Sequence, residues 1–412
     1  MGYTSIAIKG FSWLGAFRIV TRAFSLGKTA IVARFLSPSQ FGLFGIAILV
    51  LSFVEVITET GVNVFLVQQK EKTDEYISSA WIVSVVRGAI IALVMVISAP
   101  FVASFFNSPE STSLLYIMSL VPLIRGFINP SVVKFQKELL FKKEFFFRST
   151  VLAIEIAATI IILFISPTPA SLIWGLIIGA FAEMILSYVI ISPRPSFKYN
   201  RGYISELITH GKWITGATVF NYGFERGDNI VVGRVLGAQS LGLYDMAYRF
   251  SMLPITEISD IVNKVAFPVY VKISDDYLRL KRAFIRTISI ISLLVTGCGV
   301  VLIVFTEPIV RIILGEQWIA VVDILRVLAI LGIIRAISLS ISSFLLSLRK
   351  QRYLTLTTFI GLAGMLSVIV PSIATWGILG AAYAALIGYA VSVPFIIYFA
   401  YIALVEVKNK NK

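Results

Sequence analysis

Long apolar runs follow one another along the whole chain and are separated by short polar stretches. Each run is about 20 residues or longer and carries few charges, which is the length that a helix needs to cross a bilayer. Polar and apolar residues do not alternate inside the runs, so the pattern predicts transmembrane helices and not the strands of a β-barrel. We therefore expect an all-α polytopic membrane protein with twelve transmembrane helices. The predicted spans are residues 10–35, 41–67, 77–106, 112–135, 146–166, 170–192, 211–236, 241–270, 284–306, 318–347, 353–373 and 377–404.

Composition agrees with this pattern and excludes several functions. Of the 412 residues, 58% are hydrophobic and 14% are charged, against about 45–50% and about 25% in a typical globular domain. The single cysteine, Cys298, excludes an intrachain disulfide and a thiolate-bound metal cluster. The single histidine excludes a site built from several histidines. No metal or other cofactor is therefore predicted.

The basic residues gather in alternate loops and predict the orientation of the chain. Lys and Arg recur in the stretches 70–72, 134–143, 194–201, 272–282 and 349–352, whereas 107–111, 166–170 and 371–377 contain none. The positive-inside rule then places both termini in the cytoplasm. The net charge is +14, but short basic loops face anionic lipid headgroups, so we reject binding to nucleic acid.

A sequence repeat divides the chain into two halves. Residues 33–47 (ARFLSPSQFGLFGIA) resemble residues 233–247 (GRVLGAQSLGLYDMA), with Arg34 opposite Arg234. Three further matches follow in the same order: 99–107 with 307–315, 122–127 with 332–337, and 174–182 with 376–384. Each half has six helices, and an even number of crossings returns the chain to the side where it started. Both halves therefore enter the membrane from the same side and form a parallel repeat. The expected parts are an N-terminal lobe over 1–195, a basic cytoplasmic linker over 196–210 and a C-terminal lobe over 211–412.

Two parallel six-helix lobes are typical of secondary transporters, in which rocking of the lobes opens a central cleft to alternate sides of the membrane. The chain has no complete Walker-type phosphate-binding motif, so ATP hydrolysis is not expected. Charged residues inside the spans are candidates for binding, because each costs about 2.5–3.5 kcal/mol at the centre of a helix. The cationic candidates are Arg18, Arg22, Lys28, Arg125 and Arg335, and the acidic candidates are Glu55, Glu59, Glu225 and Asp228.

Ion pairing is the alternative role for several of these charges. Arg18 and Arg22 are four residues apart on one helix face, as are Glu55 and Glu59, so the two sets would neutralise each other across neighbouring helices. Such pairing in one conformation is compatible with substrate binding in another. Two further pairs have the spacing of ion pairs within one helix: Asp245 with Arg249, and Asp323 with Arg326.

When the two repeats are aligned, unlike residues occupy equivalent positions in the first helix of each lobe. Lys28 aligns with Asp228, and Arg22 aligns with Tyr222. A purely structural role does not predict a cationic first helix and an acidic seventh helix. We therefore expect an anion site in the N-terminal lobe and a carboxylate site for a coupling cation or proton in the C-terminal lobe.

Several motifs resemble those of one transporter family. They are GFSW (10–13), ARFLSPSQFGLF (33–44), TGVNVFLVQ (60–68), GRVLGAQSLGLY (233–244) and VAFPVY (265–270). Over essentially its whole length, the chain resembles bacterial polysaccharide flippases of the Wzx type, in the multidrug/oligosaccharidyl-lipid/polysaccharide (MOP) exporter superfamily. The resemblance implies two six-helix lobes around a V-shaped, alternating-access cavity in the bacterial inner membrane.

The resemblance also implies a substrate, an oligosaccharide repeat unit on an undecaprenyl pyrophosphate carrier, which is flipped to the periplasmic leaflet for O-antigen, capsule or exopolysaccharide biosynthesis. The five cationic candidates would bind the pyrophosphate, because guanidinium groups bind phosphate well and stay charged. Asn63, Asn221 and Tyr222 would contact the glycan. H⁺ or Na⁺ as the coupling ion, association with polymerase and chain-length machinery, and a monomeric state complete the expectation.

Three other functions remain open. A cation-coupled multidrug exporter of the same superfamily would favour an acidic, aromatic cavity, whereas the first lobe here is basic. The peptidoglycan-precursor flippases usually carry two further helices after the twelfth. A membrane glycan polymerase or ligase typically needs a long periplasmic loop for its catalytic residues, and the predicted periplasmic loops are short. We therefore expect a transporter and not an enzyme.

Overall fold

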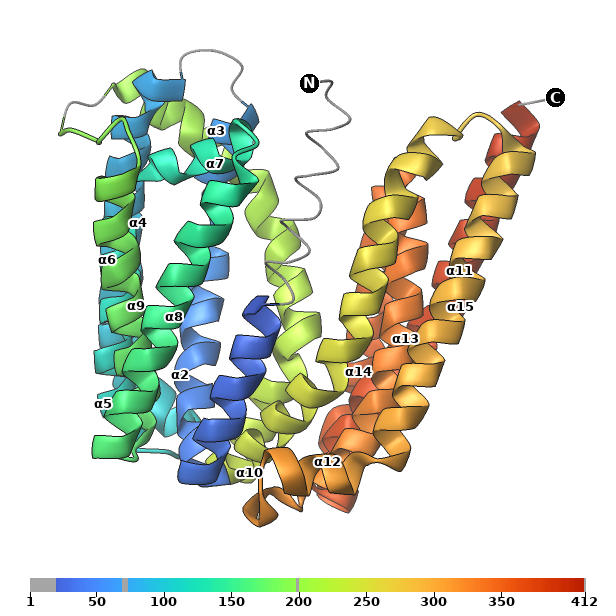
Figure 1. Ribbon diagram of the computed structural model, residues 1–412. Helices are drawn as coiled ribbons and strands as arrows, with labels where there is room; N and C mark the ends of the chain where they lie inside the picture. The colour runs from blue at the N-terminus through green and yellow to red at the C-terminus, as the bar shows by residue number, and fades with distance from the viewer. Residues whose placement is uncertain (1–19, 69–72, 198–199, 411–412) are drawn as a thin grey trace. The chain divides into compact units, whose positions relative to one another are not determined.

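The computed structural model describes residues 20–68, 73–197 and 200–410, and these ranges contain helices and no strands (Figure 1). The chain divides into two compact units, Met1–Val219 (unit 1) and Phe220–Lys412 (unit 2). The lobe and linker boundaries at residues 195 and 211 stay predictions. Arg18 lies outside the described residues.

Unit 1 is built from helices that pack mainly on their neighbours in the chain. The described part begins with a helix over residues 20–35. It continues with α2 (Pro38–Ile57), α3 (Val62–Gln68), α4 (Thr73–Phe105), α5 (Ser111–Met118), α6 (Leu120–Gly126), η1 (Pro130–Val133), α7 (Lys134–Lys137), α8 (Phe141–Ile165) and α9 (Pro169–Ile190). The helix α4 packs against α5 and α6, and α8 packs against α9. The short elements α3, η1 and α7 contact one another at one end of the unit (Figure 1).

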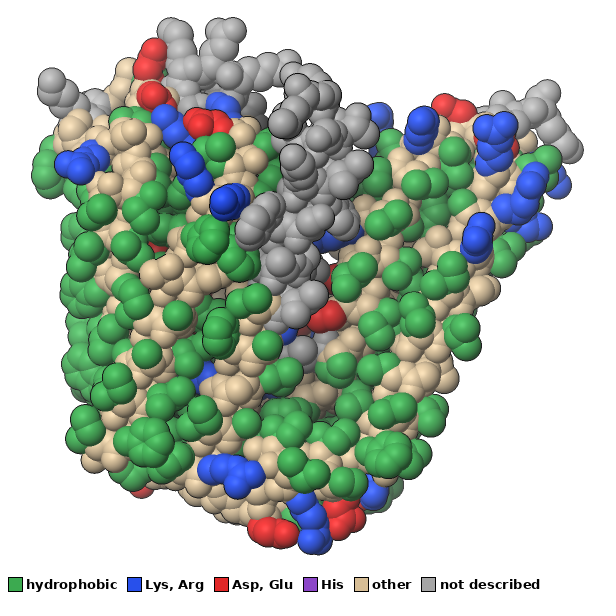
Figure 2. Space-filling view, viewed as in Figure 1, with side chains coloured by type: hydrophobic (Ala, Val, Ile, Leu, Met, Phe, Trp, Pro, Cys, Tyr) green, Lys and Arg blue, Asp and Glu red, His purple; other side chains and the backbone are tan. Residues whose placement is uncertain are grey.

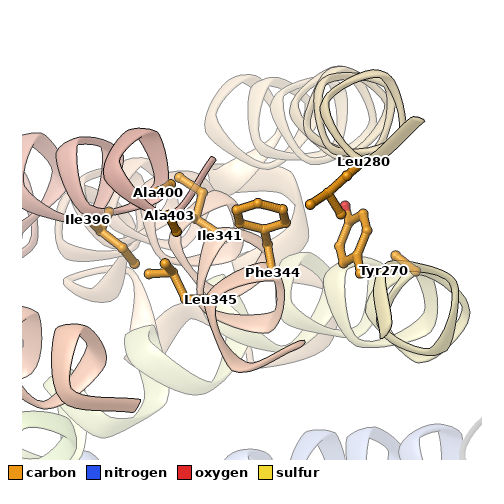
Figure 3. Close-up of a cluster of buried hydrophobic side chains, with 9 residues drawn as sticks. Tyr270, Leu280, Ile341, Phe344, Leu345, Ile396, Ala400 and Ala403 are labelled. Atoms are coloured by element: carbon orange, nitrogen blue, oxygen red, sulfur yellow. The ribbon is translucent and has the colours of Figure 1, made fainter. Parts of the chain in front are cut away.

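Unit 2 contains most of α10 and the five helices that follow it. The bounds are α10 (Arg201–Lys272), α11 (Tyr277–Val304), α12 (Thr306–Ile313), η2 (Glu316–Trp318), α13 (Val321–Ser347), α14 (Gln351–Trp376) and α15 (Ile378–Lys410). The helix α13 packs against α11, α14 and α15. Figure 3 shows a buried cluster in which Phe344 of α13 lies beside Tyr270 of α10 and Leu280 of α11. This cluster holds the end of α10 against the start of α11.

Helices within the described residues overlap each of the twelve predicted spans. Within the described ranges, eight helices are long and apolar enough to cross a membrane. Residues Ser111–Gly126 and Pro130–Lys137 form a ninth candidate, which bends by 71°. The predicted span 10–35 begins outside the described residues, and 211–236 and 241–270 both lie in α10. The helical geometry of α10 is interrupted at Gly237, whose φ of 81° separates these two spans.

Two predicted spans are broken in the structure, which corrects the expectation of continuous helices over 41–67 and 112–135. The first breaks between α2 and α3, where the Thr58 hydroxyl donates to the Val54 carbonyl oxygen at 2.7 Å. There the Glu59 carboxylate accepts the Gly61 N–H at 2.9 Å. The Val54 carbonyl oxygen also accepts the Thr58 N–H at 3.1 Å, so the regular helix of α2 ends here and side chains of Thr58 and Glu59 bind backbone groups at its end.

The second break follows from an Asn-Pro pair. The Asn129 side chain accepts the Ser131 N–H at 2.9 Å, and Pro130 occupies the first position of η1. Proline disfavours a helical conformation in the residue before it, so α6 cannot run on into η1. The bend places α7 across the end of the unit and not along the membrane-crossing direction of α6.

The repeated motif forms a turn at the same register in both units. In unit 1, the Ser37 hydroxyl accepts the Gln40 N–H, the Gln40 side chain accepts the Ser37 N–H, and Pro38 opens α2. This is a capping box, which satisfies backbone donors at a helix start. In unit 2, the turn is at Gly237, 200 positions later. Both copies of the repeated motif therefore contain a break between two helices.

Close backbone contacts hold neighbouring helices together. A Cβ atom on Gly88 of α4 would lie 2.5 Å from the Pro122 carbonyl oxygen of α6. A Cβ atom on Gly388 of α15 would lie 2.8 Å from the Gly361 carbonyl oxygen of α14. A single residue, Gly377 with a φ of 58°, connects α14 to α15. Small residues at such crossings are typical of packing between helices in membranes.

Candidate functional site

Charged side chains far from the helix ends are unusual on this protein. Figure 2 shows hydrophobic side chains over most of the visible face, with Lys and Arg mainly near the ends of the helices. The charged residues within the spans form separate clusters in unit 1 and unit 2.

The break between α2 and α3 is held by an arginine from α4. The Arg87 guanidinium lies 3.1 Å from the Glu59 carboxylate and donates at 2.8 Å to the carbonyl oxygen of Glu55. Its Nε atom also donates to the Thr58 hydroxyl at 3.4 Å. Arg87 therefore binds three groups at the broken helix end, including a carbonyl oxygen that has lost its helical partner.

A second pair lies beside the first and joins α2 to α6. The Arg125 guanidinium is 3.5 Å from the Glu55 carboxylate, and the two side chains are 42% and 35% exposed. Both residues line a cavity of about 330 Å³ within unit 1. Its lining also includes the polar residues Asn63, Ser84, Arg87, Asn129, Gln136, Arg148 and Glu183. Arginine side chains from three helices, α4, α6 and α8, thus reach one hollow.

Lys28 belongs to a different contact. Its ammonium group lies 2.7 Å from the Glu155 carboxylate of α8, and the two side chains are 17% and 20% exposed. The sequence prediction did not include Glu155. Arg22 is exposed on the same helix. The structure gives Arg125 and Arg87 as partners of Glu55 and Glu59, and pairing of these carboxylates with Arg18 or Arg22 stays a prediction.

In unit 2, a buried carboxylate links the two arms of α10 across the Gly237 turn. Asp228 is 3% exposed and accepts the Tyr244 hydroxyl at 2.7 Å and the Asn229 N–H at 2.8 Å. Asp228 comes before the turn and Tyr244 comes after it. Hydrogen bonds of this kind compensate for taking the carboxylate out of water.

Asp245 lies next to this contact and has two cationic neighbours. Its carboxylate is 2.7 Å from Arg249 and 3.5 Å from Arg226, and it accepts the side-chain amide of Asn229 at 3.5 Å. The predicted pair of Asp245 and Arg249 is confirmed. The pair of Asp323 and Arg326 is also confirmed, at 3.1 Å.

Arg335 of α13 binds two residues of α10. Its guanidinium lies 2.6 Å from the Glu225 carboxylate and donates to the Tyr248 hydroxyl. It also lies 6.0 Å from the centre of the Tyr389 ring, within the range of a cation–π contact. The side chain of Arg335 is 13% exposed, so this predicted cationic residue is mostly enclosed by groups of its own unit.

The predicted glycan contacts fall in different settings. Asn63 is exposed and lines the unit 1 cavity. Asn221 is exposed, whereas its neighbour Tyr222 is buried. Among the described residues, no group of three or more His, Cys, Asp or Glu side chains is arranged to hold a metal ion.

The fold is that of MOP superfamily transporters with twelve helices. The lipid II flippase MurJ in an inward closed conformation superposes with a TM-score of 0.77, over 95% of this chain and 89% of MurJ, at 16% identity. An inward-facing multidrug resistance MATE family transporter of the MOP superfamily gives a TM-score of 0.72, over 95% of this chain and 96% of that one, at 13% identity. Identities this low show the fold alone.

Sequence comparison narrows the class to a family. The chain belongs to the polysaccharide biosynthesis protein family, which matches residues 31–323. It is 21% identical to the lipopolysaccharide biosynthesis protein WzxC of Escherichia coli (strain K12) over 342 residues, which are 82% of this chain and 70% of WzxC. The predicted resemblance to Wzx-type proteins of the MOP superfamily is confirmed.

Proposed function

We propose that this protein is a flippase that carries undecaprenyl-pyrophosphate-linked oligosaccharide repeat units from the cytoplasmic to the periplasmic leaflet. The observation that carries the proposal is membership of the polysaccharide biosynthesis family combined with the arginine-lined cavity of unit 1. The product is a surface polysaccharide such as O-antigen, capsule or exopolysaccharide. The protein acts by alternating access of its two lobes, and it transports its substrate without catalysing a reaction.

The substrate headgroup suits the cationic residues. Pyrophosphate carries several negative charges, and guanidinium groups bind phosphate oxygens with two parallel hydrogen bonds. Arg125 is half-exposed, and its distance of 3.5 Å from the Glu55 carboxylate is long for an ion pair. A pyrophosphate can therefore compete with this carboxylate for Arg125. Arg22, Lys28 and Arg335 extend the cationic set, as does Arg18. Asn63, Asn221 and Tyr222 provide amide and hydroxyl groups for the glycan.

Energy for net transport would come from a coupling ion, H⁺ or Na⁺. The acidic candidates are Glu55 and Glu59 in unit 1, and Glu225 and Asp228 in unit 2. Asp228 is the strongest of them, because it is buried and, among the described residues, its oxygens contact no cationic group, so it gains most from binding a proton or cation.

The protein would lie in the bacterial inner membrane with both termini in the cytoplasm. The Lys- and Arg-rich loops support this orientation. The protein would act as a monomer, because a single chain supplies both lobes of the proposed transport path. The released repeat unit would pass to polymerase and chain-length proteins on the periplasmic side.

Flipping can be measured directly in proteoliposomes. The purified full chain is reconstituted with a fluorescent undecaprenyl-pyrophosphate-linked sugar, and dithionite added outside quenches only the molecules in the outer leaflet. We expect a protein-dependent rise in the quenchable fraction beyond one half. The Arg125→Gln variant should reduce the rate about tenfold or more, whereas Arg326→Gln at an exposed pair should not.

Two results would contradict the proposal. One is a wild-type rate equal to that of empty liposomes with both ion gradients tested. The other is resistance to cationic drugs in cells that express the chain, without any change in lipid-linked sugar, which would favour the multidrug exporter alternative.

A further inference from the structure

A groove runs along unit 2 between the end of α10 and the start of α11. It has a volume of about 850 Å³. The α10 side is lined by Val262, Val265 and Val269, and the α11 side by Arg279, Arg282 and Arg286. Tyr270, which also lines the groove, and Leu280 of α11 belong to one buried cluster (Figure 3). The groove is therefore a preformed feature of two helices that are packed together.

The two walls have opposite chemical character. The α10 valines recur three and four residues apart, which places them on one helix face. The α11 arginines recur at intervals of three and four and likewise share a face. An apolar stripe thus faces a cationic stripe along the length of the groove. This combination matches a ligand with an anionic head and a hydrocarbon chain.

The cationic wall has little opposing charge. No Asp or Glu is among the residues that line the groove. Arg279 has a partner in Asp276 at 3.1 Å, but both side chains are largely exposed. Arg282 and Arg286 are exposed, and the structure gives neither of them an acidic partner among the described residues. Both guanidinium groups are available to an external anion.

The arginines stand at the level expected for lipid headgroups. The 18 residues after Arg286, 287–304, contain no charged residue, and a helix of that length spans about 27 Å of hydrocarbon. Arg286 is thus the last charge before the apolar part of α11. Only 17% of the apolar part of α11 is buried, against 50% for α13, so α11 leaves most of its apolar surface uncovered by its own unit.

We propose that this groove binds an anionic phospholipid of the bilayer. The phosphate would accept hydrogen bonds from Arg282 and Arg286, and one acyl chain would lie along Val262, Val265 and Val269. Basic pockets between helices near the membrane surface have this specificity, because the headgroup needs a cation and the chain needs an apolar wall. Zwitterionic lipids fit less well, since their own cationic group opposes the arginines.

A bilayer lipid fits the groove better than the lipid-linked sugar does. Apart from the arginines, the only polar side chains in the lining are Tyr270 and Thr287. The groove lacks the amide and carboxylate groups that usually bind sugar hydroxyls. The proposed lipid site does not depend on the proposed transport function, and lipid binding can be measured without measuring transport.

Native mass spectrometry of the purified full chain tests the proposal. The protein is titrated with phosphatidylglycerol, and in parallel with phosphatidylcholine, and the bound lipids are counted. The Arg282→Gln/Arg286→Gln variant should bind phosphatidylglycerol about tenfold more weakly than the wild type. The matched control is Lys272→Gln/Lys281→Gln, which removes the same charge from exposed positions nearby that do not line the groove. It should bind like the wild type.

A second variant tests the apolar wall without changing charge. Val265 is 57% exposed, so Val265→Trp fills the groove without disturbing the core, and it should also weaken phosphatidylglycerol binding. Equal loss in the lysine control, or equal affinity for phosphatidylcholine, would overturn the proposal. So would displacement of the arginine-dependent lipid by undecaprenyl pyrophosphate, because the groove would then belong to the transported substrate.

Discussion

The charged residues of unit 1 and unit 2 are held in different ways, although the two units share a repeated sequence. In unit 1, arginines from α4 and α6 reach carboxylates at the broken end of α2, and the groups open into a cavity. In unit 2, Asp228 is enclosed and is held by a tyrosine hydroxyl and a backbone N–H of its own helix. The charges of unit 1 therefore line an open cavity, whereas Asp228 of unit 2 is buried away from water.

This difference refines the expected split between a cationic first lobe and an acidic second lobe. Lys28, Arg87 and Arg125 each have a carboxylate partner, so unit 1 offers ion pairs that can exchange partners. In unit 2, Arg335 is enclosed by Glu225, Tyr248 and Tyr389. Asp228 and Asp245 of unit 2 are 3% and 5% exposed and are more deeply buried than Glu55, Glu59 or Glu155 of unit 1. Stability measurements on single variants test this distinction.

The largest effect on stability is expected at Asp228. Asp228→Ala leaves the buried Tyr244 hydroxyl without its acceptor, which costs about 1–3 kcal/mol. Thermal melting of the purified protein in detergent should show a clear decrease in midpoint. Asp228→Asn keeps an acceptor for Tyr244 and should melt closer to the wild type. If both variants melt like the wild type, Asp228 is not enclosed as described.

The next largest effect is expected at the partly buried pair of Lys28 and Glu155. Lys28→Met removes a charged hydrogen bond and leaves Glu155 unpaired, which should destabilise unit 1 by about 1.5 kcal/mol. The reversed pair, Lys28→Glu with Glu155→Lys, should recover most of the melting temperature. Failure of the reversed pair to recover any stability would show that the contact between the two residues does not matter.

A smaller effect on stability is expected at the exposed pair of Arg125 and Glu55. Arg125→Gln should change stability by less than about 1 kcal/mol, because a half-exposed ion pair contributes little. The flipping rate in proteoliposomes should nevertheless fall. This separation of function from stability is the property that distinguishes unit 1 from Asp228. A large loss of stability in Arg125→Gln would remove the distinction.

The smallest effect is expected at the surface pair of Asp323 and Arg326. These side chains are 70% and 43% exposed and lie three residues apart on α13. Asp323→Ala should change stability by no more than about 0.5 kcal/mol. Melting and flipping should both equal the wild type within error. This variant serves as the baseline for the other three.

The sequence predicted the features that depend on neighbours along the chain. The spans follow from runs of apolar residues, and the pair of Asp245 and Arg249 follows from helical spacing. Each of these is set by residues within one or two helices. The matched positions of Ser37 and Gly237 also show that a repeat can locate a turn where the residues themselves differ.

The sequence did not predict contacts between distant helices. Lys28 and Glu155 are 127 positions apart, and no helical period connects them. The break after Ile57 has a local signal in the polar residues Thr58 and Glu59 before Gly61, but the apolar residues on either side conceal it in a hydropathy pattern. The sequence shows that Arg87 is a charged residue within the predicted span 77–106. Its contacts at the end of α2 could not be predicted, because they depend on how α4 packs against α2.

The one-residue connection between α14 and α15 has a consequence for how the protein enters the membrane. Both helices lie within residues 351–410, and the close contacts of Gly380 and Gly388 of α15 are with residues of α14. Such a hairpin can form as soon as its own residues have left the ribosome. We therefore expect the last two spans to insert together as one preassembled element, and a bulky Gly388 variant to be degraded during biogenesis before it can be purified.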